Sequence, residues 1–270
     1  MSKHLLRATL VAATAALIVP VTALADDDGH DGKNHDCHVE QGPSTAFDAT
    51  VAPAGIAANG FLFFGAGNPP TGFAQQEDPT TPLELDLGLI FRTGDSIPPA
   101  GVTSCGEIIY RVPAGPQVID PAHNVTVANP NRAAWNFNYA VVLGDAADTL
   151  EQFLGARNSL EINIDLDPGP DVRTLTLHAV YDPTHNPAGS HIVWETRQGQ
   201  ILFGDDGGTT QATENSENDA FWAALIGSDP RHLGYSFGPA TFNLELTATA
   251  RDGRVLADIR DIVEVVPPSP

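Results

Sequence analysis

The sequence predicts an all-β fold, an antiparallel β-sandwich of immunoglobulin-like or jelly-roll-like type with one or two short helices. Three observations predict it. From about residue 45 onward, short apolar runs are separated by Gly, Pro, Asn and Asp. Several of these runs alternate apolar and polar residues, which is typical of antiparallel strands with one wet face. The 270 residues include 25 glycines and 22 prolines, a share that favours a loop-rich β protein.

The alternation is clearest in residues 159–166, 172–181 and 240–250. In the first of these, Leu160, Ile162, Ile164 and Leu166 face one way and the polar residues between them face the other. We expect further strands wherever a short β-rich run lies between turn residues. These runs are 45–52, 59–65, 83–92, 106–113, 123–128, 134–143, 190–196, 199–203 and 254–266.

Local signals also predict one hairpin and two helices. Asp252-Gly253 separates two alternating runs, and glycine tolerates the positive φ of a tight hairpin turn. Residues 145–155 begin with an acidic cap and end at a glycine. Residues 216–227 begin at Ser216 with Asp219 three residues later, a capping-box pattern, and also end at a glycine.

The first 25 residues have the layout of a secretory signal peptide. Lys3 and Arg7 precede an apolar stretch, and Ala23-Leu24-Ala25 forms an A-x-A cleavage site. A membrane anchor is the alternative, but Pro20 and the small residues favour cleavage. We therefore expect a secreted or periplasmic bacterial protein with no membrane span after cleavage.

We expect four segments. Residues 1–25 are the signal peptide, 26–44 a flexible acidic, His-rich tail, 45–266 a single β-sandwich domain and 267–270 an extended Pro-rich end. The formal net charge is −21, and cleavage would leave 11 basic against 34 acidic residues, a net charge of −23. This balance argues against nucleic acid as a partner, because binding phosphates needs clustered Lys and Arg.

Export predicts a disulfide between the two cysteines, Cys37 and Cys105. The bond would close a loop of roughly 68 residues and pin the amino-terminal segment to the domain, with a stabilisation of about 4 kcal/mol. A reactive or metal-bound thiol is the alternative.

Two groups of residues are candidate metal ligands, although a domain of this size needs no cofactor to fold. His30, His35 and His38 lie among the acidic residues of the tail and would suit zinc or another transition metal. Asp165, Asp167 and Asp171 surround a Pro-Gly-Pro turn and would offer calcium an oxygen-rich site.

Two further acidic clusters, 205–208 and 214–219, are also candidates for calcium. The alternative for the tail is a solvated acidic segment, and for the clusters ordinary turns. His178, His185 and His191 match no metalloenzyme spacing, so we expect surface histidines.

Residues 234–238 match the G-x-S-x-G pattern of serine hydrolases, with Ser236 in the nucleophile position. That motif needs a strand before the serine, a helix after it and a later histidine. A β-alternating run follows instead, and His232 is the last histidine in the chain. We interpret the match as chance and expect a protein that is not an enzyme.

Residues 134–266 resemble a group of bacterial secreted β proteins that often carry carboxyl-terminal PEP-type sorting signals. The resembling segments are Trp135–Tyr139, Ile164–Gly169, Asn215–Asn218 and the closing hairpin 242–265. The resemblance implies a β fold outside the cytoplasm and no particular reaction. No apolar span or basic cluster follows Val266, so we expect release or periplasmic retention rather than membrane sorting.

The sequence thus favours an exported, non-catalytic β-sandwich with a surface, matrix or ligand-binding role and an unknown extracellular or periplasmic ligand. A calcium- or transition-metal-binding secreted protein and a secreted hydrolase are the alternatives.

Overall fold

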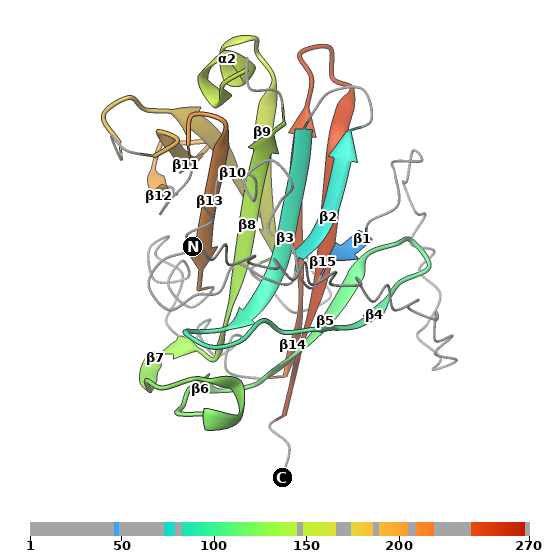
Figure 1. Cartoon of the computed structure of the whole chain (residues 1–270), viewed down its shortest axis with the longest axis vertical. Coiled ribbons are helices and arrows are strands. Elements are labelled where there is room, and N and C mark those ends of the chain that lie inside the picture. Colours follow the sequence, from blue (N-terminus) through green and yellow to red (C-terminus); the bar gives the residue numbers. More distant parts are fainter. Residues whose placement is uncertain are drawn as a thin grey trace, which may run out of the picture.

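Two sheets, antiparallel except for one strand pair, pack face to face, which confirms the all-β sandwich. The computed structural model describes residues 46–48, 73–78, 83–144, 148–165, 174–185, 189–204, 209–218 and 239–267. Figure 1 shows β2, β3, β8 and β13 side by side, with strands of the second sheet behind them.

The first sheet has five strands in the order β1-β2-β3-β8-β13, and every neighbouring pair is antiparallel. Its centre is the long pair β3–β8. The strands are β1 (Ala46–Asp48), β2 (Phe73–Asp78), β3 (Leu83–Phe91), β8 (Trp135–Leu143) and β13 (Ala212–Glu217).

The second sheet has eight strands in the order β12-β11-β10-β9-β14-β15-β5-β4. One pair, β15–β5, is parallel, whereas the sequence pattern predicted antiparallel pairing throughout. The strands are β4 (Pro99–Val102), β5 (Ile108–Pro113), β9 (Ser159–Asp165), β10 (Thr174–Tyr181), β11 (Ile192–Thr196), β12 (Ile201–Gly204), β14 (Ala240–Thr249) and β15 (Val255–Val266).

A small excursion between β5 and β8 forms what we call the 114–133 lobe. It contains the two-stranded sheet of β6 (Pro116–Gln117) and β7 (Asn129–Ala133) and a short 3-10 helix, η1 (Pro121–His123). The lobe lies at one end of the sandwich, opposite the short helix α2 (Leu150–Gly155) (Figure 1).

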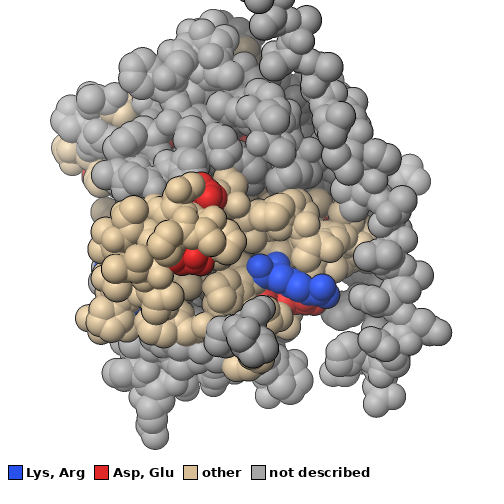
Figure 2. All heavy atoms as spheres, turned by 60° about the horizontal axis from the view of Figure 1, so that its bottom comes forward, with Lys and Arg blue, Asp and Glu red and all other residues tan. Residues whose placement is uncertain are grey.

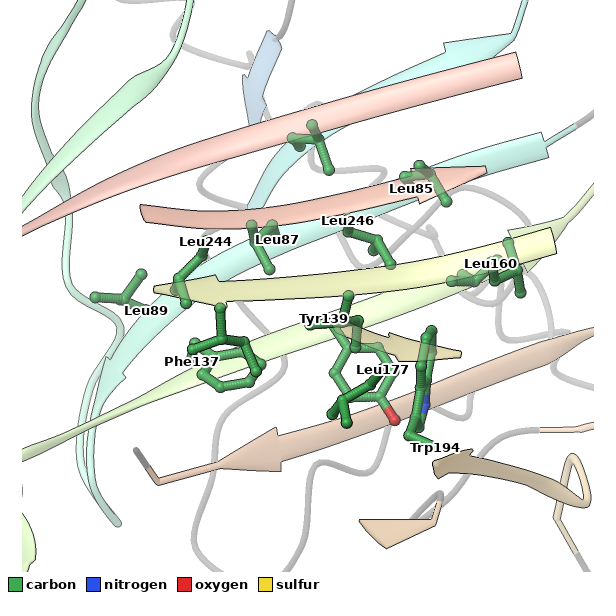
Figure 3. Close-up of a cluster of buried hydrophobic side chains, with 14 of the residues drawn as sticks. Leu85, Leu87, Leu89, Phe137, Tyr139, Leu160, Leu177, Trp194, Leu244 and Leu246 are labelled. Carbon is green, nitrogen blue, oxygen red and sulfur yellow. The ribbon is translucent and has the colours of Figure 1, made fainter. Parts of the chain in front are cut away.

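The core between the sheets is one main apolar cluster with members from both sheets. Leu85, Leu87 and Leu89 of β3 alternate with polar residues and turn inward, as do the aromatic residues of β8 (Figure 3). From the other sheet, Leu244 and Leu246 of β14 complete the contact. Period-two alternation thus gives each sheet one dry face, and burial of that face drives the packing.

Side chains close the open edge between the sheets at two places. The Asp258 backbone N–H, at a part of β15 that does not pair with β5, donates to Gln76 Oε1 of β2 at 2.6 Å. At the other side, Asn215 Nδ2 of β13 donates to the carbonyl oxygen of Gly204 in β12 at 2.6 Å. These bonds satisfy backbone groups that a sheet edge would otherwise leave unpaired.

Most expected strands are confirmed, and the expected hairpin forms. Gly253 has φ = 87° in the turn between β14 and β15, as its place in the sequence predicted. The predicted helix 145–155 is confirmed in its second half, but Thr149 and Gln152 form the capping box rather than an acidic residue.

Two predictions of local structure are wrong. Residues 123–128 do not form a strand, because Pro121 starts η1 and Asn124 ends it with φ = 59°. Ser216 does not begin a helix, because it belongs to β13 and pairs with Asn138. The predicted strand 59–65 and residues 219–227 of the predicted helix lie outside the described residues. The strands β2, β4, β6, β7 and β13 were not predicted.

Among the described residues, no helix has the length and apolar character to span a membrane.

The backbone of the closing hairpin gives a stability prediction with a matched control. A methyl group added at Gly253 or at Gly155 meets no atom within 4 Å, so neither substitution to alanine creates a clash. Gly253 has positive φ, however, and Gly155 does not. We expect Gly253→Ala to lower the free energy of unfolding by about 1–2 kcal/mol. Gly155→Ala should raise it by up to about 1 kcal/mol. Urea denaturation measures both, and equal effects would contradict the assigned turn.

Candidate functional site

The outer face of the five-stranded sheet, which points away from the core, carries a concentrated set of polar side chains. The strand register places Asp86 of β3 and Glu214 of β13 on either side of Ala140 in β8. One row along, Asn138 lies between Gly88 and Ser216. Directly paired residues share a face of the sheet, so Asp86, Asn138 and Glu214 surround the small side chain of Ala140.

This polar face is buried, unlike a solvated sheet surface. The exposed fraction is 0% for Asp86, 1% for Asn138 and 0% for Glu214. Glu84, on the same face one row away, is 7% exposed. Charged residues are almost never fully buried unless they are compensated, so this face is the strongest candidate for a specific role.

Hydrogen bonds organise one end of the face. Asn136 Nδ2 donates to Ser216 Oγ at 2.9 Å, and Asn218 Nδ2 donates to Asn136 Oδ1 at 2.8 Å. Asn218 Nδ2 also reaches the carbonyl oxygens of Ala133 and Trp135. Asn138 differs, because neither atom of its amide has a hydrogen-bond partner in the described structure.

The residue types set the chemistry that this face can support. Two carboxylates and an unpartnered amide are hard oxygen donors, which suit calcium or magnesium rather than a transition metal. Neither histidine nor cysteine is among the three residues around Ala140. The three side chains are oxygen donors, and they do not include a nucleophile beside a base.

A further buried carboxyl, that of Asp261, lies in the core instead. It stands in the line of core-facing residues of β15 and pairs with Leu244 of β14 and Ile108 of β5. It is 0% exposed, and neither of its carboxyl oxygens has a hydrogen-bond partner in the described structure. Burial raises the pKa of Asp261 well above its usual range, which favours the neutral acid inside the core.

The outer face of the eight-stranded sheet is also polar but only partly buried. Cross-strand bonds link it: Thr176 Oγ1 donates to Asn163 Oδ1, and Asn163 Nδ2 donates to Glu245 Oε2, both at 2.7 Å. Arg260 Nη2 then lies 2.6 Å from Glu245 Oε1 and 2.9 Å from Asp258 Oδ2. Burial and the Glu245 charge raise the pKa of Asp258, and Arg260 opposes this rise. Because its groups satisfy one another, this face carries no candidate site.

The predicted metal ligands are not assembled by the described residues. His30, His35, His38, Asp167 and Asp171 lie outside them. Asp165 ends β9, is 3% exposed, and its Oδ2 accepts a hydrogen bond from Asn243 Nδ2 at 3.4 Å. Within the described ranges, no three His, Cys, Asp or Glu side chains converge to hold a metal ion. Of the other two acidic clusters, residues 205–208 lie outside the described residues. The cluster 214–219 contributes Glu214 to the polar face.

The three histidines that bracket the β10–β11 connection have separate surroundings. His178 Nδ1 lies 3.1 Å from Glu161 Oε1 on the outer face of the eight-stranded sheet. His191 Nδ1 donates to the carbonyl oxygen of His185 at 2.8 Å. The imidazole of His185 packs so closely on Gly204 that a side chain there would collide with it. These contacts are structural, and the surface position predicted for His178 is confirmed.

Sequence reasoning missed Asp86 and Asn138. Their alternation with apolar residues in β3 and β8 is visible in the sequence, but alternation predicts a solvated face. The residues of the G-x-S-x-G segment, 234–238, lie outside the described residues, so that interpretation stays a prediction. No known protein-family model matches the chain, and comparisons with curated proteins and with solved structures also give no match.

Asp261 gives a prediction of pH dependence. Below the unfolded pKa of about 3.8, the carboxyl is protonated in both states, and its burial does not reduce the free energy of unfolding. As the pH rises towards the higher pKa of the folded state, the free energy of unfolding falls. We therefore expect Asp261→Asn to have a higher free energy of unfolding than the wild type at pH 7, because the amide carries no charge to bury. The difference should shrink towards pH 4. Denaturation from pH 4 to 8 measures it, with Asp252→Asn in the exposed hairpin turn as control. A difference that is constant with pH would refute the assignment.

The disulfide gives a second prediction. Cys105 lies in the turn between β4 and β5, where its backbone N–H donates to Thr103 Oγ1 at 3.2 Å, and Cys37 lies outside the described residues. We expect intact-mass measurement to find the oxidised form. Reductant should lower the free energy of unfolding by about 4 kcal/mol, with no effect on a Cys37→Ser/Cys105→Ser variant. Two free thiols in the native protein would rule the bond out.

Proposed function

We propose that this protein is an exported, non-catalytic binding protein that contacts an extracellular matrix or surface polymer through the 114–133 lobe. The observation that carries the proposal is the exposure of large apolar side chains there. Val118 is 59% exposed, Ile119 61% and Val127 54%. They are three of the five large apolar residues that are exposed in the described structure, and the other two, Ile201 and Val255, are isolated from them in sequence. Exposed apolar residues that gather on one surface mark interaction sites.

The lobe is held in a defined conformation, which favours a preformed contact surface. Arg92 Nη1 of the turn after β3 donates to Gln117 Oε1 at 2.6 Å, and Gln117 Nε2 donates back to the Arg92 carbonyl oxygen. Asn124 Nδ2 donates to Asp95 Oδ1 at 2.8 Å. A preorganised surface loses little conformational entropy when it binds.

Packing adds to this restraint. The rings of Phe91 and His123 stack with centroids 4.1 Å apart. Gly94 approaches His123 so closely that an added methyl group would lie 2.4 Å from the His123 carbonyl oxygen. The lobe and the turn 92–95 therefore form one unit, and its shape depends on a glycine at that position.

The scarcity of charged side chains at this end of the molecule favours a contact that does not depend on charge. Seen from the end that carries β6 and β7, the described surface is mostly uncharged, with isolated acidic and basic side chains (Figure 2). The chain as a whole is strongly acidic, with a net charge of −21. An apolar contact on such a protein avoids the repulsion that an acidic partner would meet elsewhere on it.

Binding to a panel of immobilised matrix polysaccharides, peptidoglycan and matrix proteins tests the proposal. We expect the mature protein to bind at least one of them, and a Val118→Ser/Ile119→Ser variant to bind about tenfold more weakly or worse. An Ile201→Ser/Val255→Ser variant is the matched control, since it removes equally exposed apolar side chains outside the lobe.

Two outcomes would contradict the proposal. If the lobe variant binds as tightly as the wild type, the lobe is not the contact surface. If the wild type binds none of the polymers, the proposed binding function is wrong. Turnover of ester, peptide or glycoside substrates that disappears in Ser236→Ala would instead establish the hydrolase alternative.

A further inference from the structure

The exposed apolar residues of the 114–133 lobe lie together on its hairpin. Two residue pairs join the arms of this hairpin, Gln117 with Asn129 and Asp120 with Val125. The short stretches between these pairs therefore run side by side. All of their residues are exposed and none is charged. The three large apolar ones form what we call the aliphatic patch: Val118, Ile119 and Val127.

The buried residues of the same hairpin fix it to the turn 92–95. Gln117 is 2% exposed and Val125 3%, and Gln117 Nε2 donates to Thr93 Oγ1 at 3.1 Å. Thr93 has φ = 61°, a left-handed conformation that a β-branched residue rarely adopts. Strained residues of this kind cluster at binding and active sites, where the surrounding structure holds them in place. The anchor of the aliphatic patch therefore has a property that is typical of functional sites.

The side chains of the lobe are poorly suited to a polysaccharide. Sugars carry many hydroxyl groups, and burying these against valine and isoleucine leaves them without hydrogen bonds. Residues 114–133 contain no Phe, Tyr or Trp, so the lobe has no large aromatic ring on which a sugar could stack. The ring of His123 already stacks on Phe91. Apolar side chains of another protein would lose only water when they pack on the patch.

The charge of the chain disfavours an acidic partner, including a second copy of itself. The formal net charge is −21, and two such molecules repel each other as they approach. An anionic membrane surface repels the chain in the same way, because attraction to that surface needs clustered Lys and Arg. A partner without net negative charge avoids this repulsion, and a basic one would be attracted.

We propose that the aliphatic patch binds another protein, through a segment that presents aliphatic side chains and carries no net negative charge. This partner class rests on the proposed function, in which the lobe is the contact surface. Valine and isoleucine have few rotamers, so their side chains lose little conformational freedom in the contact. The gain in free energy comes from the removal of apolar surface from water, and no covalent step is involved.

Selection from a display library of random peptides tests this partner class. Peptides that bind the mature full-length protein are counter-selected on the Val118→Ser/Ile119→Ser variant. We expect the enriched peptides to share aliphatic residues and to lack net negative charge. A synthetic copy of the most enriched peptide should bind the variant about tenfold more weakly than it binds the wild type. Val127→Ser, on the facing arm of the hairpin, should weaken binding by a smaller factor, and Ile201→Ser/Val255→Ser should leave it unchanged.

The proposal is overturned if no peptide is enriched, or if the enriched peptides are acidic or lack aliphatic residues. Lobe-dependent binding to matrix polysaccharides alone, or to phosphatidylcholine vesicles alone, would also overturn it. In either case the lobe would remain a contact surface and only the partner class would be wrong. A lobe-dependent dimer of the wild type in sedimentation would make a second copy the partner and overturn it too. If the lobe variant binds every one of these probes as the wild type does, the proposed function fails as well.

Discussion

Burial of both faces of β3 and β8 is the constraint on which the rest of this structure depends. Their inner faces are apolar and pack on the eight-stranded sheet, as the alternation of leucines in β3 requires. Their outer faces are polar, and yet Asp86 and Asn138 are as inaccessible as the core leucines. Water cannot solvate these groups, so the molecule itself or a bound ligand must satisfy them.

The eight-stranded sheet shows the ordinary solution to the same problem. Its outer face is polar too, but its groups are only partly buried and bond across the strands, as Asn163 does to Glu245. Such a face needs no ligand, and its solvated pairs contribute little to stability. The two outer faces therefore differ in burial, since Glu214 and its neighbours on the five-stranded sheet are inaccessible to solvent. Asp261 is a third case, since burial in the apolar core favours its neutral acid.

Much of the fold could be predicted from the sequence because strand pairing follows side-chain periodicity. The alternation in 159–166 and 240–250 gave both the strands and the faces that they bury. The errors arose where local signals competed with tertiary structure. Ser216 has the sequence pattern of a helix cap, but pairing with Asn138 places it in a strand. The candidate site was harder still, because periodicity shows that Asp86 leaves the core face but cannot show that its own face is buried. Asp261 was detectable, since it interrupts an apolar line in β15.

The accessibility of the outer face of the five-stranded sheet tests this account most directly. A single cysteine introduced at Ala140, at the centre of the polar face, can be compared with one at the exposed Thr241 of β14. We expect a thiol reagent to modify Thr241→Cys rapidly in the native protein. We expect Ala140→Cys to react only as fast as the protein opens, at a rate that denaturant raises. Equal rates at the two positions in native buffer would show that the polar face is solvated and would contradict the account.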